Sequence, residues 1–151
     1  MARGLTASAT ATLDAPRRNV WQALVDPAAI KQYMFGADVV SDWHEGSPIV
    51  WRGEWKGKPY EDKGVILHVQ PNEKLEYTHY SPLTGKPDVP DSYHTVTVTL
   101  TGEGARTRVT IAQDNNADDE SRRRSEDNWN TMLGGLKRYV EGASSPAHHS
   151  A

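Results

Sequence analysis

Two histidines stand at positions where they could act together as an acid and a base. His79 lies near the end of one strand-like run and His94 at the start of the next, with the loop 81–91 between them. Antiparallel pairing of these runs would place both side chains on neighbouring strands and on one face. Because imidazole titrates near neutral pH, the pair could transfer protons, with Tyr77 or Tyr93 assisting. Two strand-end histidines with only a structural role are the alternative.

The residue types give little support to other kinds of catalysis. The chain has no cysteine, which excludes thiol nucleophiles, disulfides and thiolate-bound zinc. The remaining histidines, His44, His68, His148 and His149, offer no dense spacing of metal ligands, so we expect no metal and no cofactor. The sequence also lacks the Gly-x-Ser-x-Gly motif and any phosphate-binding loop.

Two side-chain amides could provide neutral hydrogen bonds. Gln113 and Asn115 alternate in step with Val109 and Ile111, which predicts that all four share one face of a strand. If the amides are buried, a ligand oxygen or a water must satisfy them. Exposure at the end of the strand is the alternative.

A glycine pair, Gly134-Gly135, interrupts a helical pattern near the C-terminus. A glycine inside a helix costs roughly 0.5–1 kcal/mol relative to alanine. The pair therefore indicates either room for a ligand, or a kink or close packing of the helix, for example on the alanine-rich segment 5–13.

The segments that must position these residues follow from periodicity. Segment 5–13 alternates Leu and Ala with Thr and Ser, which predicts a strand with one buried face. After Pro16 the apolar residues recur at helical spacing, and Asp26-Pro27 begins a second short helix that closes at Phe35-Gly36. Strand-like runs separated by turn residues follow at 37–43, 49–56, 60–70, 73–80, 93–101 and 107–115.

The last segment, from Asp118 to Gly142, predicts one long amphipathic helix. Trp129, Leu133, Leu136 and Val140 form a single apolar stripe along it. This helix is the only predicted element large enough to cover the face that the antiparallel strands must bury. The sequence therefore predicts an α+β fold in which a curved antiparallel sheet wraps around the C-terminal helix.

Length and charge restrict the class of protein. The 151 residues suit one domain, which we expect at 1–142, followed by a disordered tail at 143–151. With 17 Lys and Arg against 20 Asp and Glu, the net charge of −3 predicts no nucleic-acid partner. No apolar run is long enough for a membrane span, and the N-terminus has no signal-peptide core, so a cytoplasmic location is expected.

Several segments together resemble a known family. Residues 13–16 with 20–27 form the most specific match, and residues 64–75 and 129–139 agree with it in order and spacing. On these segments the chain resembles the START-like (SRPBCC) superfamily, which has the helix-grip fold. Within that superfamily it is most similar to the branch of the activator of heat-shock protein 90 ATPase. A local departure is Tyr33-Met34-Phe35, where relatives often carry Trp-Phe or Trp-Trp.

The resemblance implies a cavity between the sheet and the terminal helix. It therefore predicts a binding protein for small hydrophobic or aromatic molecules. A cyclase, dehydratase or hydrolase using His and Tyr, and a cochaperone-like or stress-response protein with a chaperone partner, are the alternatives. The resemblance and strand parity together predict these ligand-binding residues: Phe35, Trp51, Trp55, Tyr77, His79, His94, Gln113, Asn115, Trp129, Met132, Leu133 and Leu136. The ligand, any catalysis and the oligomeric state are left open.

Overall fold

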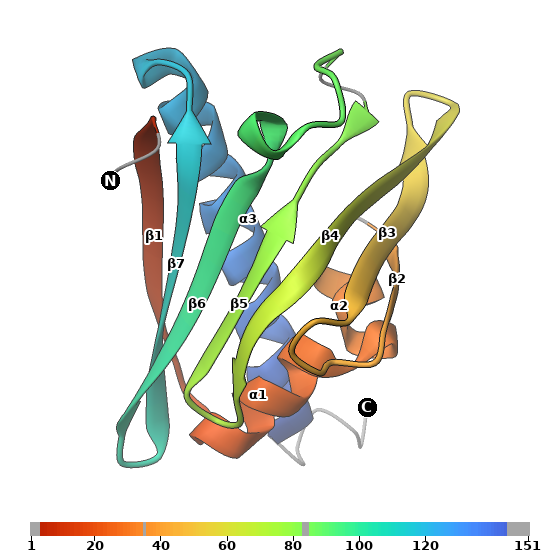
Figure 1. Ribbon diagram of the computed structural model, residues 1–151. Coiled ribbons are helices and arrows are strands. Elements are labelled where there is room, and N and C mark those ends of the chain that lie inside the picture. Colours follow the sequence, from red (N-terminus) through yellow and green to blue (C-terminus); the bar gives the residue numbers. More distant parts are fainter. Residues whose placement is uncertain (1–3, 35, 83–84, 145–151) are drawn as a thin grey trace.

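The strands of this protein form a single antiparallel sheet (Figure 1). The computed structural model describes residues 4–34, 36–82 and 85–144. Within these ranges the sheet has seven strands in the order β1-β7-β6-β5-β4-β3-β2. In chain order the strands are β1 (Leu5–Leu13), β2 (Asp38–Ser41), β3 (Pro48–Trp55), β4 (Lys58–Gln70), β5 (Lys74–His79), β6 (His94–Glu103) and β7 (Arg106–Asn116).

Two short helices follow β1 and one long helix follows β7. They are α1 (Arg17–Val25), α2 (Pro27–Tyr33) and α3 (Asp119–Ser144), and a short 3-10 turn, η2 (Pro90–Ser92), precedes β6. Asp26 separates the first two helices because its carboxylate accepts a hydrogen bond from the Ala28 amide at 3.0 Å. Proline at the first position of α2 has no amide hydrogen that would need an acceptor there.

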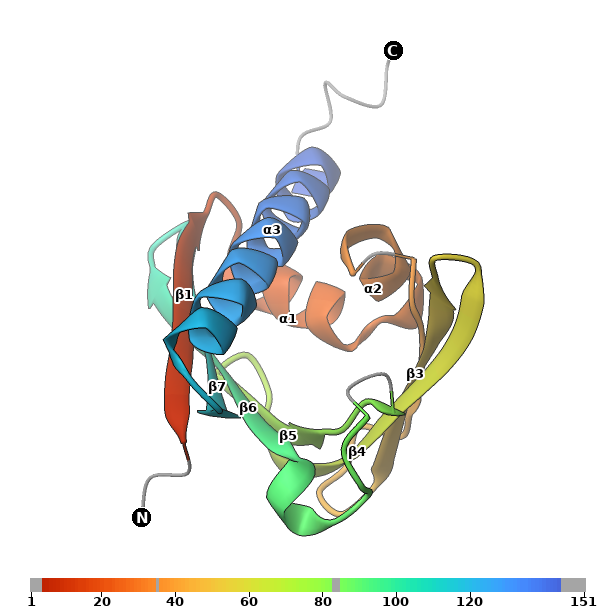
Figure 2. The ribbon, with the colours of Figure 1, turned by 90° about the horizontal axis from the view of Figure 1, so that it is seen from above.

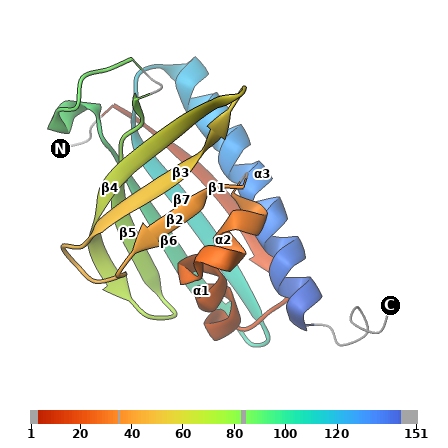
Figure 3. The ribbon, with the colours of Figure 1, turned by 90° about the vertical axis from the view of Figure 1, so that its right-hand side faces the viewer.

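The sheet is strongly curved, and the helices lie inside the curve. Figure 2 shows the strands from β1 round to β3 forming a trough that holds α3 beside β1, with α1 and α2 next to it. Figure 3 shows that α3 extends beside the strands from one end of the sheet to the other. This arrangement confirms the predicted α+β helix-grip fold.

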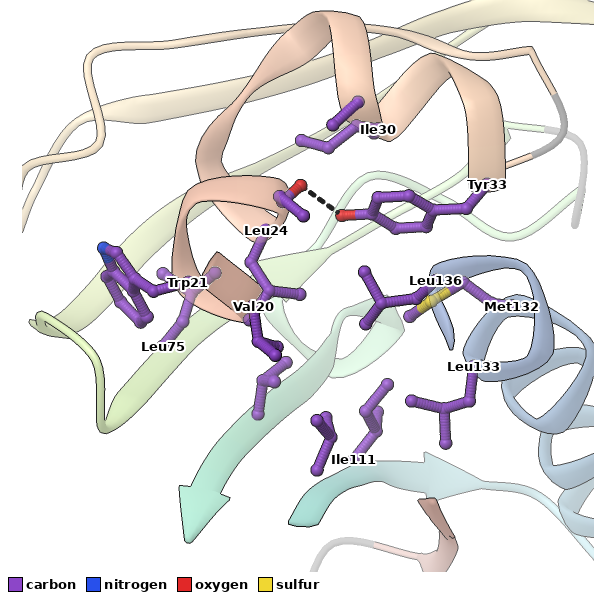
Figure 4. Close-up of a cluster of buried hydrophobic side chains, with 14 of the residues drawn as sticks. Val20, Trp21, Leu24, Ile30, Tyr33, Leu75, Ile111, Met132, Leu133 and Leu136 are labelled. Atoms are coloured by element: carbon purple, nitrogen blue, oxygen red, sulfur yellow. Dashed lines mark hydrogen bonds between the residues drawn. The ribbon is translucent and has the colours of Figure 1, made fainter. Parts of the chain in front are cut away.

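The hydrophobic core lies where the helices meet the concave face of the sheet. Leu133 and Leu136 of α3 are fully buried and pack into the cluster that contains Ile111 of β7 (Figure 4). Tyr33 is also buried, and its hydroxyl donates a hydrogen bond to the Ala23 carbonyl at 2.8 Å. That bond joins α2 to α1 and satisfies a polar atom inside the core.

The two helix glycines have different surroundings. A Cβ atom on Gly135 would lie 3.1 Å from Cβ of Tyr33, so this glycine lets α3 approach α2 closely. A Cβ atom on Gly134 would meet only the Arg138 guanidinium, at 3.7 Å. The close approach is therefore to α2, and the suggested packing of the glycine pair on the strand 5–13 is wrong.

Most differences between the predicted and observed elements lie at their ends. The helix α3 continues to Ser144, past the predicted end at Gly142, because nothing at Gly142 breaks the helical hydrogen bonding. Residues 145–151 of the predicted tail lie outside the described residues. Tyr80, predicted as part of a strand, instead forms an isolated bridge with Lys63 beyond the end of β5.

Candidate functional site

A pocket with a volume of about 330 Å³ lies between the concave face of the sheet and α3. Strands β3 to β7 contribute its floor, and α3 and the end of α2 contribute its other walls. The residues that line it are Met34, Ala37, Trp51, Tyr60, Asp62, Tyr77, His79, His94, Val96, Gln113, Ser125, Asn128, Trp129 and Met132.

Aromatic rings form much of the pocket wall. Trp51 and Tyr77 are buried and pack with their ring centroids 5.3 Å apart. Trp51 also meets the His79 ring edge-to-face, with 5.0 Å between the centroids. Such tilted and edge-on arrangements are favourable for aromatic pairs and stabilise this wall of the pocket.

His79 and His94 lie together in the pocket. They are directly paired in the antiparallel ladder of β5 and β6. Their rings are stacked at an angle of 27°, with centroids 6.4 Å apart. The hairpin argument from the sequence thus places them correctly, on neighbouring strands and on the same face.

His79 has a carboxylate partner that the sequence analysis missed. Its Nε2 lies 2.9 Å from Oδ2 of Asp62, and only 14% of the Asp62 side chain is exposed. The second carboxylate oxygen, Oδ1, is buried and has no hydrogen-bond partner among the described residues. Asp62 alternates in step with the buried Gly64 and Ile66 along β4, and this parity was the available signal.

His94 is held by the backbone of the next strand. Its Nδ1 donates a hydrogen bond to the Asp114 carbonyl at 2.8 Å, which leaves Nε2 as the acceptor nitrogen of the neutral ring. Burial lowers the pKa of His94, and the hydrogen bond to Asp114 opposes this effect in part. The ring is therefore neutral at neutral pH.

A chain of hydrogen bonds fixes the opposite side of the pocket. The Trp129 indole nitrogen donates to Oε1 of Gln113 at 2.7 Å, and the Gln113 amide donates to Ser125 Oγ at 3.4 Å. Ser125 in turn donates to Oδ1 of the buried Asn116 at 2.8 Å. Gln113 lies on the predicted face, but its amide group already has protein partners.

Asn115 does not lie on the face shared by Gln113, contrary to the prediction. Its backbone has a φ of 60°, and the β1–β7 register shifts between Leu5 and Ala7. The shift is a bulge, which reverses the alternation of side chains. Asn115 therefore turns away from the pocket and donates to the carbonyls of Asp91 and Tyr93, at 2.8 and 3.0 Å.

The other predicted site residues fall into three groups. Met132 lines the pocket, as predicted. Leu133 and Leu136 do not line the pocket, because they lie in the packed core with Val20 and Ile111 (Figure 4). Phe35 and the side chain of Trp55 lie outside the described residues.

Tyr60 is a second pocket residue that the sequence analysis missed. A Cβ atom on Gly53, opposite Tyr60 in the β3–β4 ladder, would lie 2.6 Å from the tyrosine hydroxyl. Glycine at position 53 therefore makes room for the ring. Burial and the nearby Asp62 carboxylate raise the pKa of Tyr60, so its hydroxyl stays protonated and can donate a hydrogen bond.

The described residues contain no cluster of three or more His, Asp or Glu side chains that could hold a metal ion. Among the helices in the described ranges, none is both long enough and apolar enough to cross a membrane.

The comparison with protein families identifies the relatives of this fold. The model of the family described as "Activator of Hsp90 ATPase homolog 1-like protein" matches residues 14–141. The chain belongs to this family. The family resemblance inferred from the sequence is thus confirmed. The match includes all the residues that line the pocket, and β1 lies outside it. The comparison with curated proteins gave no match.

Solved structures share the fold of this chain. ChR145 from Cytophaga hutchinsonii is 54% identical, with a TM-score of 0.82 over 95% of this chain and 99% of ChR145. DynU16, from the dynemicin biosynthetic locus, is 21% identical, with a TM-score of 0.75 over 91% of this chain and 48% of that one. The Aha1 dimer from Colwellia psychrerythraea is 17% identical, with a TM-score of 0.70, and the match covers 91% of this chain and 96% of that one. The last two likenesses concern the fold alone.

Proposed function

We propose that this protein binds small, mainly hydrophobic molecules with aromatic groups in the pocket between the sheet and α3. The observation that carries the proposal is a 330 Å³ pocket with an aromatic wall and a few convergent polar groups. Ligand sites typically have volumes of about 300–1,000 Å³ and this mixture of apolar walls and sparse polar groups. The pocket is therefore suited to a compact ligand of one or two rings.

The test blocks the pocket without disturbing the core. Asn128 is an exposed residue of α3 that lines the pocket, so Asn128→Trp should obstruct it while the fold stays intact. Asn130→Trp is the matched control, because Asn130 is exposed on the same helix and does not line the pocket. Calorimetric titration with 2-naphthol should show binding to the parent and to the control, with at least a tenfold loss in Asn128→Trp.

Two results would count against binding in this pocket. One is the absence of any heat of binding across a panel of one- and two-ring aromatics, together with native mass spectra of the purified protein that show no retained molecule. The other is equal affinity of the two tryptophan variants, which would place the ligand elsewhere.

An acid–base enzyme is a second candidate, supported by the Asp62–His79 pair beside His94. A carboxylate that orients one imidazole next to a neutral second imidazole is an arrangement that can move protons. Turnover of an acyl or polyketide substrate that is lost in both His79→Gln and His94→Gln, with ligand binding retained, would support this candidate. Binding without turnover would leave the protein a carrier.

A chaperone partner is a third candidate, and its support is the family description, which names the Hsp90 ATPase. The direct test adds the purified protein to Hsp90 from the same cell and measures the rate of ATP hydrolysis. A role in stress responses belongs to this candidate and depends on its outcome, whereas the proposed location in the cytoplasm does not depend on it.

A further inference from the structure

We infer that the ligand is a hydroxyaromatic, or a similar neutral molecule with a hydrogen-bond donor on an aromatic body, and that its donor is recognised by His94 and His79. This inference rests on the proposed function, since it states which molecules the same pocket selects. It follows from the polar atoms of the pocket that have no hydrogen-bond partner among the described residues.

The first open atom is Nε2 of His94. The other ring nitrogen donates to the Asp114 carbonyl at 2.8 Å, so the neutral ring has its hydrogen on Nδ1. Nε2 then carries a lone pair and accepts no hydrogen bond from the described residues. Because His94 lines the pocket, a donor on a bound molecule can reach this nitrogen.

The second open atom is Nδ1 of His79. The Nε2 atom of this ring is occupied by the Asp62 carboxylate at 2.9 Å, and the near-parallel stacking on His94 places both rings on the same side of the pocket. In its neutral form, His79 therefore offers a second acceptor on a ring that also lines the pocket.

Among the remaining polar groups that line the pocket, the Tyr60 and Tyr77 hydroxyls and the Asn128 amide can still donate or accept hydrogen bonds. The others are occupied. Gln113, Ser125 and the Trp129 indole nitrogen bind one another, and one oxygen of Asp62 is paired while the other is covered by protein. The open side of the pocket thus presents acceptor nitrogens beside a carboxylate. A ligand carboxylate would be repelled there, and a ligand that only accepts hydrogen bonds would leave these nitrogens unpaired.

A neutral donor fits better than a cationic amine. One oxygen of the Asp62 carboxylate accepts a hydrogen bond from His79 and the other is covered by protein, so neither is open to a ligand ammonium group. Transfer of an ammonium group from water into a pocket walled by Trp51, Tyr77 and Met132 would lose hydration without a free counter-charge. A phenol-type hydroxyl donates one hydrogen bond and carries no charge.

The test uses three probes with the same two-ring body. 2-Naphthol has the donor, 2-methoxynaphthalene lacks it, and 2-naphthoate carries a negative charge. We expect 2-naphthol to bind about tenfold more tightly than 2-methoxynaphthalene, which corresponds to one buried hydrogen bond, and 2-naphthoate to bind most weakly. 2-Naphthylmethylamine, which is cationic at neutral pH, should bind less tightly than 2-naphthol.

Two variants test whether His94 causes the preference for 2-naphthol over 2-methoxynaphthalene. In His94→Phe the ring is kept and the acceptor nitrogen is lost, so the affinity ratio of 2-naphthol to 2-methoxynaphthalene should fall from about ten to near one. His68→Phe is the control, because His68 is partly exposed, pairs with Glu45 and does not line the pocket. That variant should keep the ratio of the parent.

A spectroscopic readout on the unaltered protein covers the case in which His94→Phe does not fold. The nitrogen resonance of His94 Nε2 should shift upfield on addition of 2-naphthol and stay in place with 2-methoxynaphthalene. Equal binding of these two probes to the parent, tighter binding of the amine, or an unshifted Nε2 resonance at saturation would overturn the inference and leave the binding function standing. Failure of every probe to bind would instead refute the proposed function itself.

Discussion

At the scale of single residues, the site depends on which nitrogen of each imidazole is occupied. His94 was recognisable from the sequence because a hairpin sets it opposite His79, and the ladder pairs these two residues directly. Asp62 was missed although its parity with Gly64 and Ile66 was visible, because the β4–β5 register shifts between Ile66 and His68 and this shift cannot be read from the sequence. Asn115 was misplaced because the bulge beside it leaves no mark in the alternation of residues.

The protonation of His94 gives a prediction for the pH dependence of binding. Burial lowers its pKa from the ordinary value of 6.5, so the ring is neutral at neutral pH and protonates only in more acidic solution. Protonation turns Nε2 into a donor and removes the acceptor. The preference for 2-naphthol over 2-methoxynaphthalene should therefore hold from about pH 7.5 to below 6.5 and vanish at lower pH.

Calorimetric titrations at a series of pH values check this prediction. Other charged groups also act on His94: His79 and Lys86 oppose its protonation, and Asp114 favours it. Asp62 faces His79 from β4 and is part of the same system. In His94→Phe the affinity ratio should be flat across the range. A ratio that falls well above pH 6.5 in the parent protein would contradict the assignment of a buried, neutral His94.

At the scale of elements, local patterns predicted the segments well and their contacts poorly. The strict alternation of Leu and Ala with Thr and Ser in the first segment predicted β1, Leu5–Leu13, and its buried positions Ala7, Ala9 and Leu13 are all apolar. The glycine pair in α3 was visible as an anomaly, but its neighbour, Tyr33 of α2, depends on how two helices pack. Contacts between distant elements need the assembled fold.

The same glycine pair provides a matched test of helix packing. Gly134→Ala should stabilise the protein by about 0.5–1 kcal/mol, because the added methyl group meets only the end of the Arg138 side chain. Gly135→Leu should destabilise it by about 1–3 kcal/mol, because the side chain would collide with Tyr33. Urea unfolding of both variants checks the contrast, and equal effects of the same sign would show that α3 does not approach α2 at Gly135.

At the scale of the whole molecule, the fold follows from one long helix that covers the concave face of one sheet. The sequence predicted this because only the segment after residue 118 could bury the face of so many strands. The sequence did not predict how the space between α3 and the sheet is filled. At one end side chains pack around Leu136, and at the other end the pocket remains. Which side chains fill the space depends on the curvature of the sheet and on α1 and α2.

The packed end of the interface carries the stability of the molecule. Leu136 is fully buried, so Leu136→Ala should lower the free energy of unfolding by about 2–5 kcal/mol. Leu67→Ala removes the same atoms from an exposed position on β4 and should change it by less than about 0.5 kcal/mol. Denaturant unfolding measures both, and a small effect at Leu136 would mean that the C-terminal half of α3 does not hold the sheet.

The central claim, that the pocket is the ligand-binding site, is tested most directly by mapping backbone and indole NMR shifts during a titration with 2-naphthol. The account predicts that the largest shifts cluster at Trp51, His79, His94 and Trp129, all of which line the pocket. Residues on the outer face of β4, such as Val65 and Leu67, should not shift. Saturable shifts confined to that outer face, or no saturable shifts at all, would contradict the account.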